Sequence, residues 1–180
     1  MRQKNAMYSA ALLLLLCAPS LSLACQEEEK QRRPSRYLIP DGFVGWVKIY
    51  YKVKDAPPLP FEDGAYLFKI PASGVLKTSS SMEYGWASDE YFYYSDDARR
   101  PLKETGWGEG GMIWAGHNGS RETAQMGQST DEIPEENKTY YSGFFVGTEA
   151  EYKDYGRWVD DQEPGPIDKE AIERKKKKDN

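Results

Sequence analysis

The chain has few of the residues that build disulfides and metal sites. Its 180 residues include two cysteines, Cys17 and Cys25, and a single histidine, His117. We expect Cys17 to be removed with a leader and Cys25 to be the new N-terminus, so the folded domain must be stable without a disulfide. A zinc site usually needs several His or Cys ligands, and a Ser-His-Asp triad needs its histidine held by a carboxylate. The sequence therefore predicts no metal site, no cofactor and no catalytic constellation.

Excess positive charge and long apolar runs are also missing. The chain carries 24 Lys and Arg against 29 Asp and Glu, a net charge of −5, and loss of Arg2 and Lys4 with the leader leaves −7. Binding to phosphate backbones requires clustered Lys and Arg, so we expect no nucleic-acid partner. The longest apolar run, Ala10 to Leu16, is too short to span a bilayer as a helix of the mature protein.

The N-terminus is organised as an export signal. Residues 1–24 have a basic start, an apolar core and small residues before a cleavage site, as a signal peptide does. Leu21 to Cys25 is similar to a bacterial lipobox, although Ser22 stands where that pattern usually has leucine. We expect cleavage before Cys25, acylation of Cys25 and a place in the bacterial cell envelope, with plain secretion as the alternative. Gln26 after the cysteine resembles an outer-membrane address, which favours an outer-membrane lipoprotein.

A polar tether is predicted for residues 25–36, and a β domain for residues 37–160. From Phe43 to Val53 the odd positions are apolar, whereas the even positions mix aromatic residues with lysines. Because successive side chains of a strand point to opposite faces, this pattern predicts a strand with one buried face. The Asp63-Gly64 pair is typical of a tight hairpin turn.

Further strands are expected at Glu90–Tyr94, Met112–Ala115 and Tyr140–Gly147, and a long loop at residues 118–138. No segment of helical period interrupts them. The predicted fold is mainly β: a single antiparallel β-sandwich of about seven strands, with one or two short C-terminal helices.

The helices are predicted by their caps. Thr148 and Glu151 have the spacing of a capping box, in which each side chain satisfies an amide of the first turn. Asp168 is placed to cap a second helix within residues 161–180, which we interpret as a linker and a charged C-terminal helix or tail. Lysines 175–178 suit the C-terminal end of that helix, and contact with an anionic surface is the alternative.

Trp46 and Tyr50 are the candidate ligand-binding residues. They share the mixed face of the predicted strand at 43–53 with Lys48 and Lys52. If this face is exposed, its rings can stack on sugars or receive a partner protein. If it is covered, the rings form a second packed layer with lysine stems lying over it.

Two other sequence patterns give weaker evidence for a functional site. Gly106 to Gly111 fits G-x-G-x-x-G, but the residues that follow predict a strand instead of the helix that a dinucleotide fold requires, so a glycine-rich loop is favoured. Paired carboxylates can hydrolyse glycosides at a suitable separation, which a sequence does not reveal.

Five segments together resemble a bacterial family of unknown function, whose members are small exported proteins that often carry a lipobox. The resemblance covers most of residues 36–157, and the segments are 37–53, 57–79, 83–95, 108–114 and 143–156. The strand–turn–strand pattern is also distantly similar to prealbumin-like sandwiches, including the regulatory domains of carboxypeptidases. That second likeness implies a fold and no ligand.

The sequence thus predicts a non-enzymatic binding or structural protein, held on a membrane by an N-terminal lipid and having a protein or a glycan as its partner. One alternative is a carbohydrate-binding module that uses Trp46 and Tyr50. The other is a carboxylate-dependent hydrolase.

Overall fold

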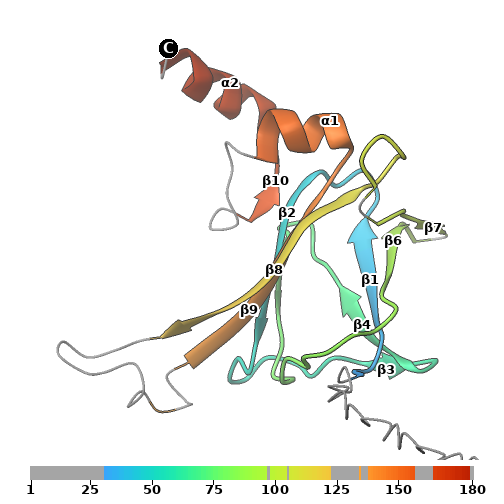
Figure 1. Ribbon diagram of the computed structural model, residues 1–180. Coiled ribbons are helices and arrows are strands. Elements are labelled where there is room, and N and C mark those ends of the chain that lie inside the picture. Colours follow the sequence, from blue (N-terminus) through green and yellow to red (C-terminus); the bar gives the residue numbers. More distant parts are fainter. Residues whose placement is uncertain are drawn as a thin grey trace, which may run out of the picture.

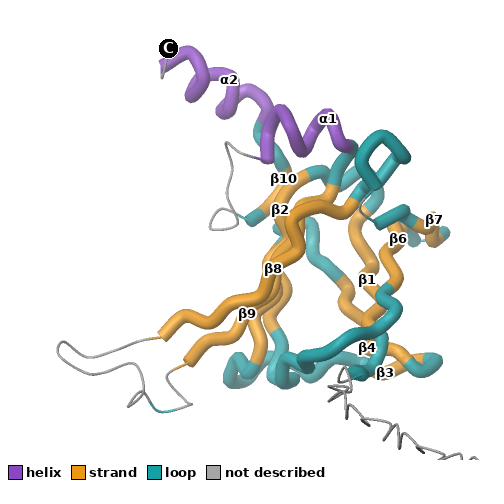
Figure 2. Tube along the Cα trace, in the orientation of Figure 1, coloured by secondary structure: helices purple, strands orange, loops and turns teal. Residues whose placement is uncertain are grey.

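The computed structural model describes residues 31–96, 98–104, 106–122, 134, 138–156 and 164–178. The predicted signal peptide at 1–24 and Cys25 lie outside these residues. Within these residues ten strands, where about seven were predicted, form two five-stranded sheets that face each other, with the helices gathered at one end (Figures 1 and 2). Within the described part of the chain, no helix has both the length and the apolar character needed to cross a membrane. The predicted mainly β fold with short C-terminal helices is confirmed, in a sandwich-like arrangement.

Each sheet has a continuous strand order. The first sheet runs, from edge to edge, β3 (Phe61–Glu62), β4 (Ala65–Lys69), β1 (Ser35–Pro40), β6 (Glu90–Tyr94) and β7 (Arg99–Pro101). The second sheet runs β10 (Gly165–Pro166), β2 (Gly45–Tyr51), β9 (Lys138–Val146) and β8 (Ile113–Glu122), and β5 (Val75–Lys77) also pairs with β2.

Strand pairing is mixed, which corrects the prediction of a purely antiparallel sandwich. β1 pairs in parallel with β4 and β6, and β2 pairs in parallel with β5. The cause is the path of the chain, which crosses from one sheet to the other after β1, β2, β4, β5 and β7. Such a crossing allows a strand to re-enter the sheet in the same direction, as β6 does beside β1, whereas a hairpin such as β3–β4 gives an antiparallel pair.

The core lies between the two sheets. The odd positions of β2 face the core as predicted, with Val47 and Ile49 fully buried and Tyr51 nearly so, but the prediction of a single buried face is wrong, because Trp46 and Lys48 on the other face are buried too. The three side chains at the odd positions pack in one cluster with Ile39 of β1 and Val146 of β9. Burying a side chain of this size contributes roughly 1.5–3 kcal/mol, so this cluster is the main source of stability in a domain without disulfides.

The long hairpin of β8 and β9 differs from the sequence prediction. The predicted loop at 118–138 is wrong for residues 118–122, which continue β8. Residues 123–133 and 135–137 lie outside the described part of the chain. The register of β8 shifts between Trp114 and His117, and Ala115 has a φ of 51°, which marks a β-bulge.

The helical end follows the predicted caps. Thr148 begins α1 (Glu149–Glu151), which continues as a π-helical turn, η3 (Tyr152–Gly156). The capping box is present, with the Glu151 amide donating to Thr148 Oγ1 at 3.2 Å and the Thr148 amide to Glu151 Oε2 at 2.9 Å. Asp168 accepts from the Ala171 amide at 2.9 Å at the start of α2 (Lys169–Lys178).

The domain begins earlier than the predicted boundary at residue 37. β1 starts at Ser35, and Gln31 already forms a bridge with Trp86. The part of the predicted tether that remains outside the described domain is therefore residues 25–30.

Candidate functional site

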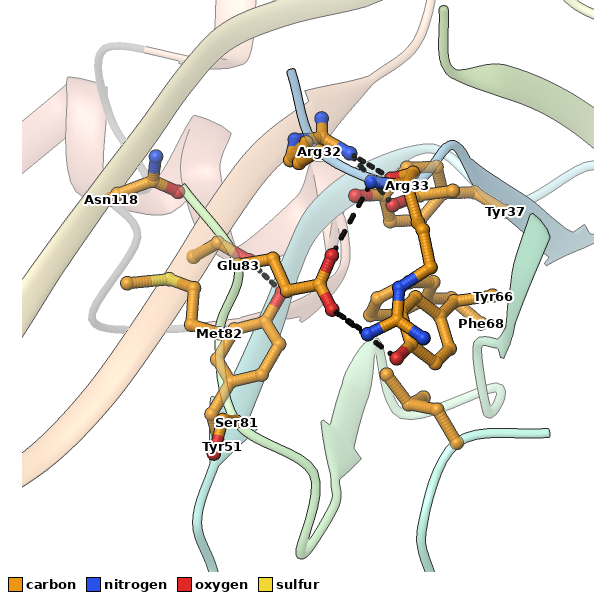
Figure 3. Close-up of a pocket in the computed structure, with 13 residues that line it drawn as sticks. Arg32, Arg33, Tyr37, Tyr51, Tyr66, Phe68, Ser81, Met82, Glu83 and Asn118 are labelled. Atoms are coloured by element: carbon orange, nitrogen blue, oxygen red, sulfur yellow. Dashed lines mark hydrogen bonds and ion pairs between the residues drawn. The ribbon is translucent and has the colours of Figure 1, made fainter. Parts of the chain in front are cut away.

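Two adjoining cavities open between the sheets, at the end away from the helices. The larger, of about 310 Å³, is called here the inter-sheet cleft, and the smaller, of about 80 Å³, is drawn in Figure 3. Arg32, Tyr37, Asn118 and Ser142 line both. Arg32 lies in the segment before β1 and Tyr37 lies in β1. Asn118 belongs to β8 and Ser142 to β9. Both sheets therefore contribute to the site.

A paired charge holds the wall of the cleft in place. Arg32 binds Asp89 with both terminal guanidinium nitrogens, at 3.0 Å to Oδ1 and 2.5 Å to Oδ2, and the Ser35 amide adds a third bond to Oδ1 at 3.0 Å. The side chains are 18% and 12% exposed. The hydrogen bond to Asp89 raises the pKa of Arg32. Both oxygens of Asp89 are thus occupied, and this carboxylate fixes the start of β1 against the segment before β6.

Four tyrosines line the two cavities, and three of them, Tyr37, Tyr51 and Tyr91, are well buried. Burial raises the pKa values of Tyr37, Tyr51 and Tyr91, so each is a neutral phenol at ordinary pH. The rings of Tyr37 and Tyr91 stack at 4.7 Å. The Tyr51 hydroxyl and Ser142 Oγ are 2.9 Å apart. These side chains offer hydrogen bonds without adding charge.

The bulge in β8 decides which side chains of that strand reach the cleft. Ile113 points into the core, so an unbroken alternation would turn Asn118 away from it. The register shift reverses the alternation, and Asn118 then pairs with Ser142 and lines both cavities. His117 instead carries its ring to the outer face, 6.0 Å from the ring of Trp46.

Glu104 adds a carboxyl group to the rim of the inter-sheet cleft. Partial burial and the negative charge of Asp89 raise its pKa. The cleft therefore contains two different carboxyl groups: Asp89, which forms an ion pair with Arg32, and Glu104, whose pKa is raised. Among the described residues, no three histidine, cysteine or carboxylate side chains gather as metal ligands would.

The smaller cavity is walled by a second ion pair. Arg33 donates to Glu83 Oε1 at 2.6 Å, the Tyr66 hydroxyl donates to the same oxygen at 3.2 Å, and the Arg33 guanidinium lies 4.8 Å from the Tyr66 ring centre (Figure 3). Partial burial acts to raise the pKa of Glu83, but the hydrogen bonds from Arg33 outweigh it and the pKa is lowered.

Trp46 and Tyr50 lie on the opposite side of the second sheet from the cleft. Trp46 is only 6% exposed and packs with Trp114 and Phe145, so its ring does not lie on an open surface. Tyr50 is half-buried, 6.4 Å from the Tyr141 ring. The alternative of a second packed layer describes this face, because even Lys48 is buried, with Nζ 4.3 Å from the Tyr141 ring. Ligand binding at Trp46 and Tyr50 stays a prediction. The buried ring of Trp46 offers no open surface for it.

The glycine-rich segment forms a closed turn before β8. The Gly111 amide donates to the Gly106 carbonyl at 3.2 Å, and the Gly108 amide donates to Glu149 Oε2 at 2.6 Å. A carboxylate of this chain therefore occupies a position at which an anion could have bound. The predicted loop is confirmed.

Sequence reasoning missed the residues that the fold brings together in the cleft. Arg32 and Asp89 are 57 positions apart, and nothing in either segment points to the other. The alternation of Tyr91 and Tyr93 within the predicted strand at 90–94 was the available signal for an inward tyrosine face. For the bulge that turns Asn118 inward, the only signal in the sequence is Gly116.

Comparisons with known proteins find a matching family and a solved structure of similar fold. The chain matches a family described as "Family of unknown function (DUF6843)" over residues 31–153. A crystal structure of a candidate lipoprotein from Bacillus anthracis is similar, with a TM-score of 0.51 and 23% identity, over 81% of this chain and 89% of that one. At this identity the likeness concerns the fold. No curated protein gives a significant match.

Proposed function

We propose that this chain, which belongs to the DUF6843 family of unknown function, is an exported, lipid-anchored protein of the bacterial cell envelope that binds a ligand and does not catalyse a reaction. The export signal and the lipobox-like segment ending at Cys25 support the anchor. The Bacillus anthracis protein of similar fold is itself described as a candidate lipoprotein, which agrees with this placement. Gln26 favours the outer membrane where the cell has one.

The observation that carries the binding role is the inter-sheet cleft. Its volume of about 310 Å³ lies in the range of small-molecule sites, and polar groups from both sheets converge on it. Its arginine is paired with Asp89, and apart from Glu104 and His117 the other polar side chains of the lining, Tyr37, Tyr91, Asn118 and Ser142, are uncharged. This chemistry suits a neutral, hydroxyl-rich ligand, so we assign a carbohydrate to the cleft. The carbohydrate hypothesis thereby moves from Trp46 and Tyr50 to the space between the sheets.

A carboxylate-dependent hydrolase is the second candidate, favoured by one observation. The raised pKa of Glu104 is what a general acid requires. Against it, both oxygens of Asp89 accept hydrogen bonds from Arg32 and Ser35, which leaves the second carboxylate poorly placed to activate water. Incubation with oligosaccharides followed by product analysis separates the two roles. Cleavage that is lost in Glu104→Gln would favour the hydrolase, whereas binding without cleavage favours the proposed role.

Titration calorimetry with neutral oligosaccharides, including soluble cell-wall fragments, tests the ligand. We expect binding by the wild type and at least tenfold weaker binding by the Asn118→Ala, Ser142→Ala double variant. The matched control is Ser79→Ala, which removes an exposed serine hydroxyl outside both cavities. Equal affinity in the wild type and the double variant, or no binding of any neutral glycan, would contradict the assignment.

The anchor is tested separately. Mass spectrometry of the mature protein from cells is expected to find Cys25 as the first residue, carrying acyl chains, and cell fractionation is expected to place the protein with membranes. An unacylated mature protein in the medium would establish secretion instead.

A further inference from the structure

Large aromatic side chains are exposed at one end of the domain. Among the described residues, four large hydrophobic side chains are strongly exposed: Phe61 at 51%, Tyr84 at 53%, Trp86 at 60% and Trp107 at 56%. Three of them are near the first described residues of the chain: Trp86 and Phe61 contact Gln31 and Arg33, respectively, and Tyr84 follows Glu83, which is paired with Arg33. We call these three the aromatic patch. Exposed aromatic groups of this size mark interaction surfaces more often than single scattered residues do.

Gln31, Arg32 and Arg33 contact two members of the patch and the neighbour of the third. Gln31 forms a bridge with Trp86, and the Arg32 amide donates to the Trp86 carbonyl at 3.0 Å. The Arg33 guanidinium lies 5.8 Å from the Phe61 ring centre and is paired with Glu83, the neighbour of Tyr84. The patch is therefore built around the point at which the chain enters the domain.

This entry point lies close to the expected anchor. Gln31 follows Cys25 by six residues, so the connecting chain reaches at most about 20 Å. The start of β1 and β3 lie at one end of the domain, and α1 and α2 at the other (Figure 1). A lipid on Cys25 thus keeps the end that carries the patch near the membrane, and the helical end away from it.

We propose that the aromatic patch docks onto the interfacial layer of a phospholipid bilayer and sets the orientation of the domain above the membrane. The proposal rests on the lipid anchor of the proposed function. Trp and Tyr are enriched at membrane interfaces, where their rings meet the apolar boundary and their polar atoms meet water. The two arginines beside the patch are paired, Arg32 with Asp89 and Arg33 with Glu83, so docking should need no anionic lipid and should change little with salt.

A single-cysteine probe tests this in the full mature lipoprotein reconstituted into phosphatidylcholine vesicles. The anchor cysteine is acylated and does not react, so Trp86→Cys gives one labelling site for an environment-sensitive fluorophore. Trp107→Cys is the matched control, because Trp107 is equally exposed but packs against Tyr152 at the helical end. We expect blue-shifted emission, quenched by spin-labelled lipid, at position 86, and water-like emission at position 107.

Vesicle flotation in the same samples reports the anchor independently. If the protein does not float, the anchor of the proposed function fails. If it floats and position 86 is as water-like as position 107, docking by the patch is refuted while the anchor stands. A blue-shifted probe at position 86 that lipid-attached quenchers do not reach would indicate a protein contact and would also overturn the proposal. Replacing Tyr84 and Phe61 by Ser in the labelled protein is expected to return the emission at position 86 toward that of water.

Discussion

The space between the two sheets has a closed end and an open end, and tyrosines at the two ends serve different purposes. At the closed end, near the helices, the Tyr93 hydroxyl donates to the Phe43 carbonyl at 2.7 Å, and apolar side chains fill the remaining volume. At the open end, Tyr37 and Tyr91 border the inter-sheet cleft, and Tyr51 meets Ser142. The closed end therefore contributes mainly to the stability of the fold, whereas the open end is less densely packed and leaves space for a ligand.

The largest effect is expected from breaking the closed end. Ile39 is fully buried, and Ile39→Ala should lower the free energy of unfolding by about 2–5 kcal/mol because it leaves a cavity in the core. Denaturant unfolding measures this, with Ile39→Val as the graded control at about 0.5–1.5 kcal/mol. Glycan affinity of the folded fraction should be unchanged. A loss below 1 kcal/mol for the alanine variant would mean that this end is not the rigid part of the molecule.

The second largest effect on stability is expected from breaking the Arg32–Asp89 ion pair at the open end. Asp89→Ala leaves Arg32 without its partner in a mostly buried position, and we expect a loss of roughly 2–3 kcal/mol in the free energy of unfolding. The control is Asp41→Ala, which breaks the exposed pair with Arg100 and should cost less than about 1 kcal/mol. Similar losses in the two variants would show that the Arg32–Asp89 pair does not hold the cleft wall.

Alkaline pH should lower the free energy of unfolding through the buried tyrosines at both ends. Burial raises the pKa of Tyr93 to about 12, and raises those of Tyr37 and Tyr91 too, from an ordinary value of 10.0. The unfolded chain therefore releases these protons first, so stability is retained below pH 10 and falls as the pH rises toward about 12. Unfolding measured across this range, with tyrosinate absorbance as a second signal, checks the sign. Stability that stays constant or increases above pH 10 would show that these phenols are not buried in the folded state.

The smallest effect on stability is expected at the ligand-facing wall. Asn118 is exposed to the cleft, and Asn118→Ala should change the free energy of unfolding by no more than about 0.5 kcal/mol. Its effect should be seen in glycan affinity instead. Calorimetric titration and denaturant unfolding of the same preparation separate the two quantities. A large stability loss without a change in affinity would assign Asn118 to the core.

Local features could be predicted from the sequence, and long-range ones could not. The alternation of Val47 and Ile49, the Asp63-Gly64 turn and the Thr148 cap each depend on neighbours within a few residues. The parallel pairing of β1 with β6 depends on which sheet the chain enters next, which alternation does not encode.

The candidate site was missed for the same reason. The mixed strand face of Trp46 left an exposed and a covered arrangement open, and the structure shows Trp114 and Tyr152 from distant segments packed on that face. Arg32 meets Asp89 only after both sheets have formed. The residues of the inter-sheet cleft therefore become visible only in the folded structure.

Mapping of a glycan titration by heteronuclear NMR on the labelled protein tests the central claim most directly. If the open end is the binding site, amide shifts should concentrate at Asn118, Ser142 and Gly143, and those of Ile39 and Val47 at the closed end should stay fixed. Shifts that gather instead around Tyr50 on the outer face, or that spread evenly over both ends, would contradict it.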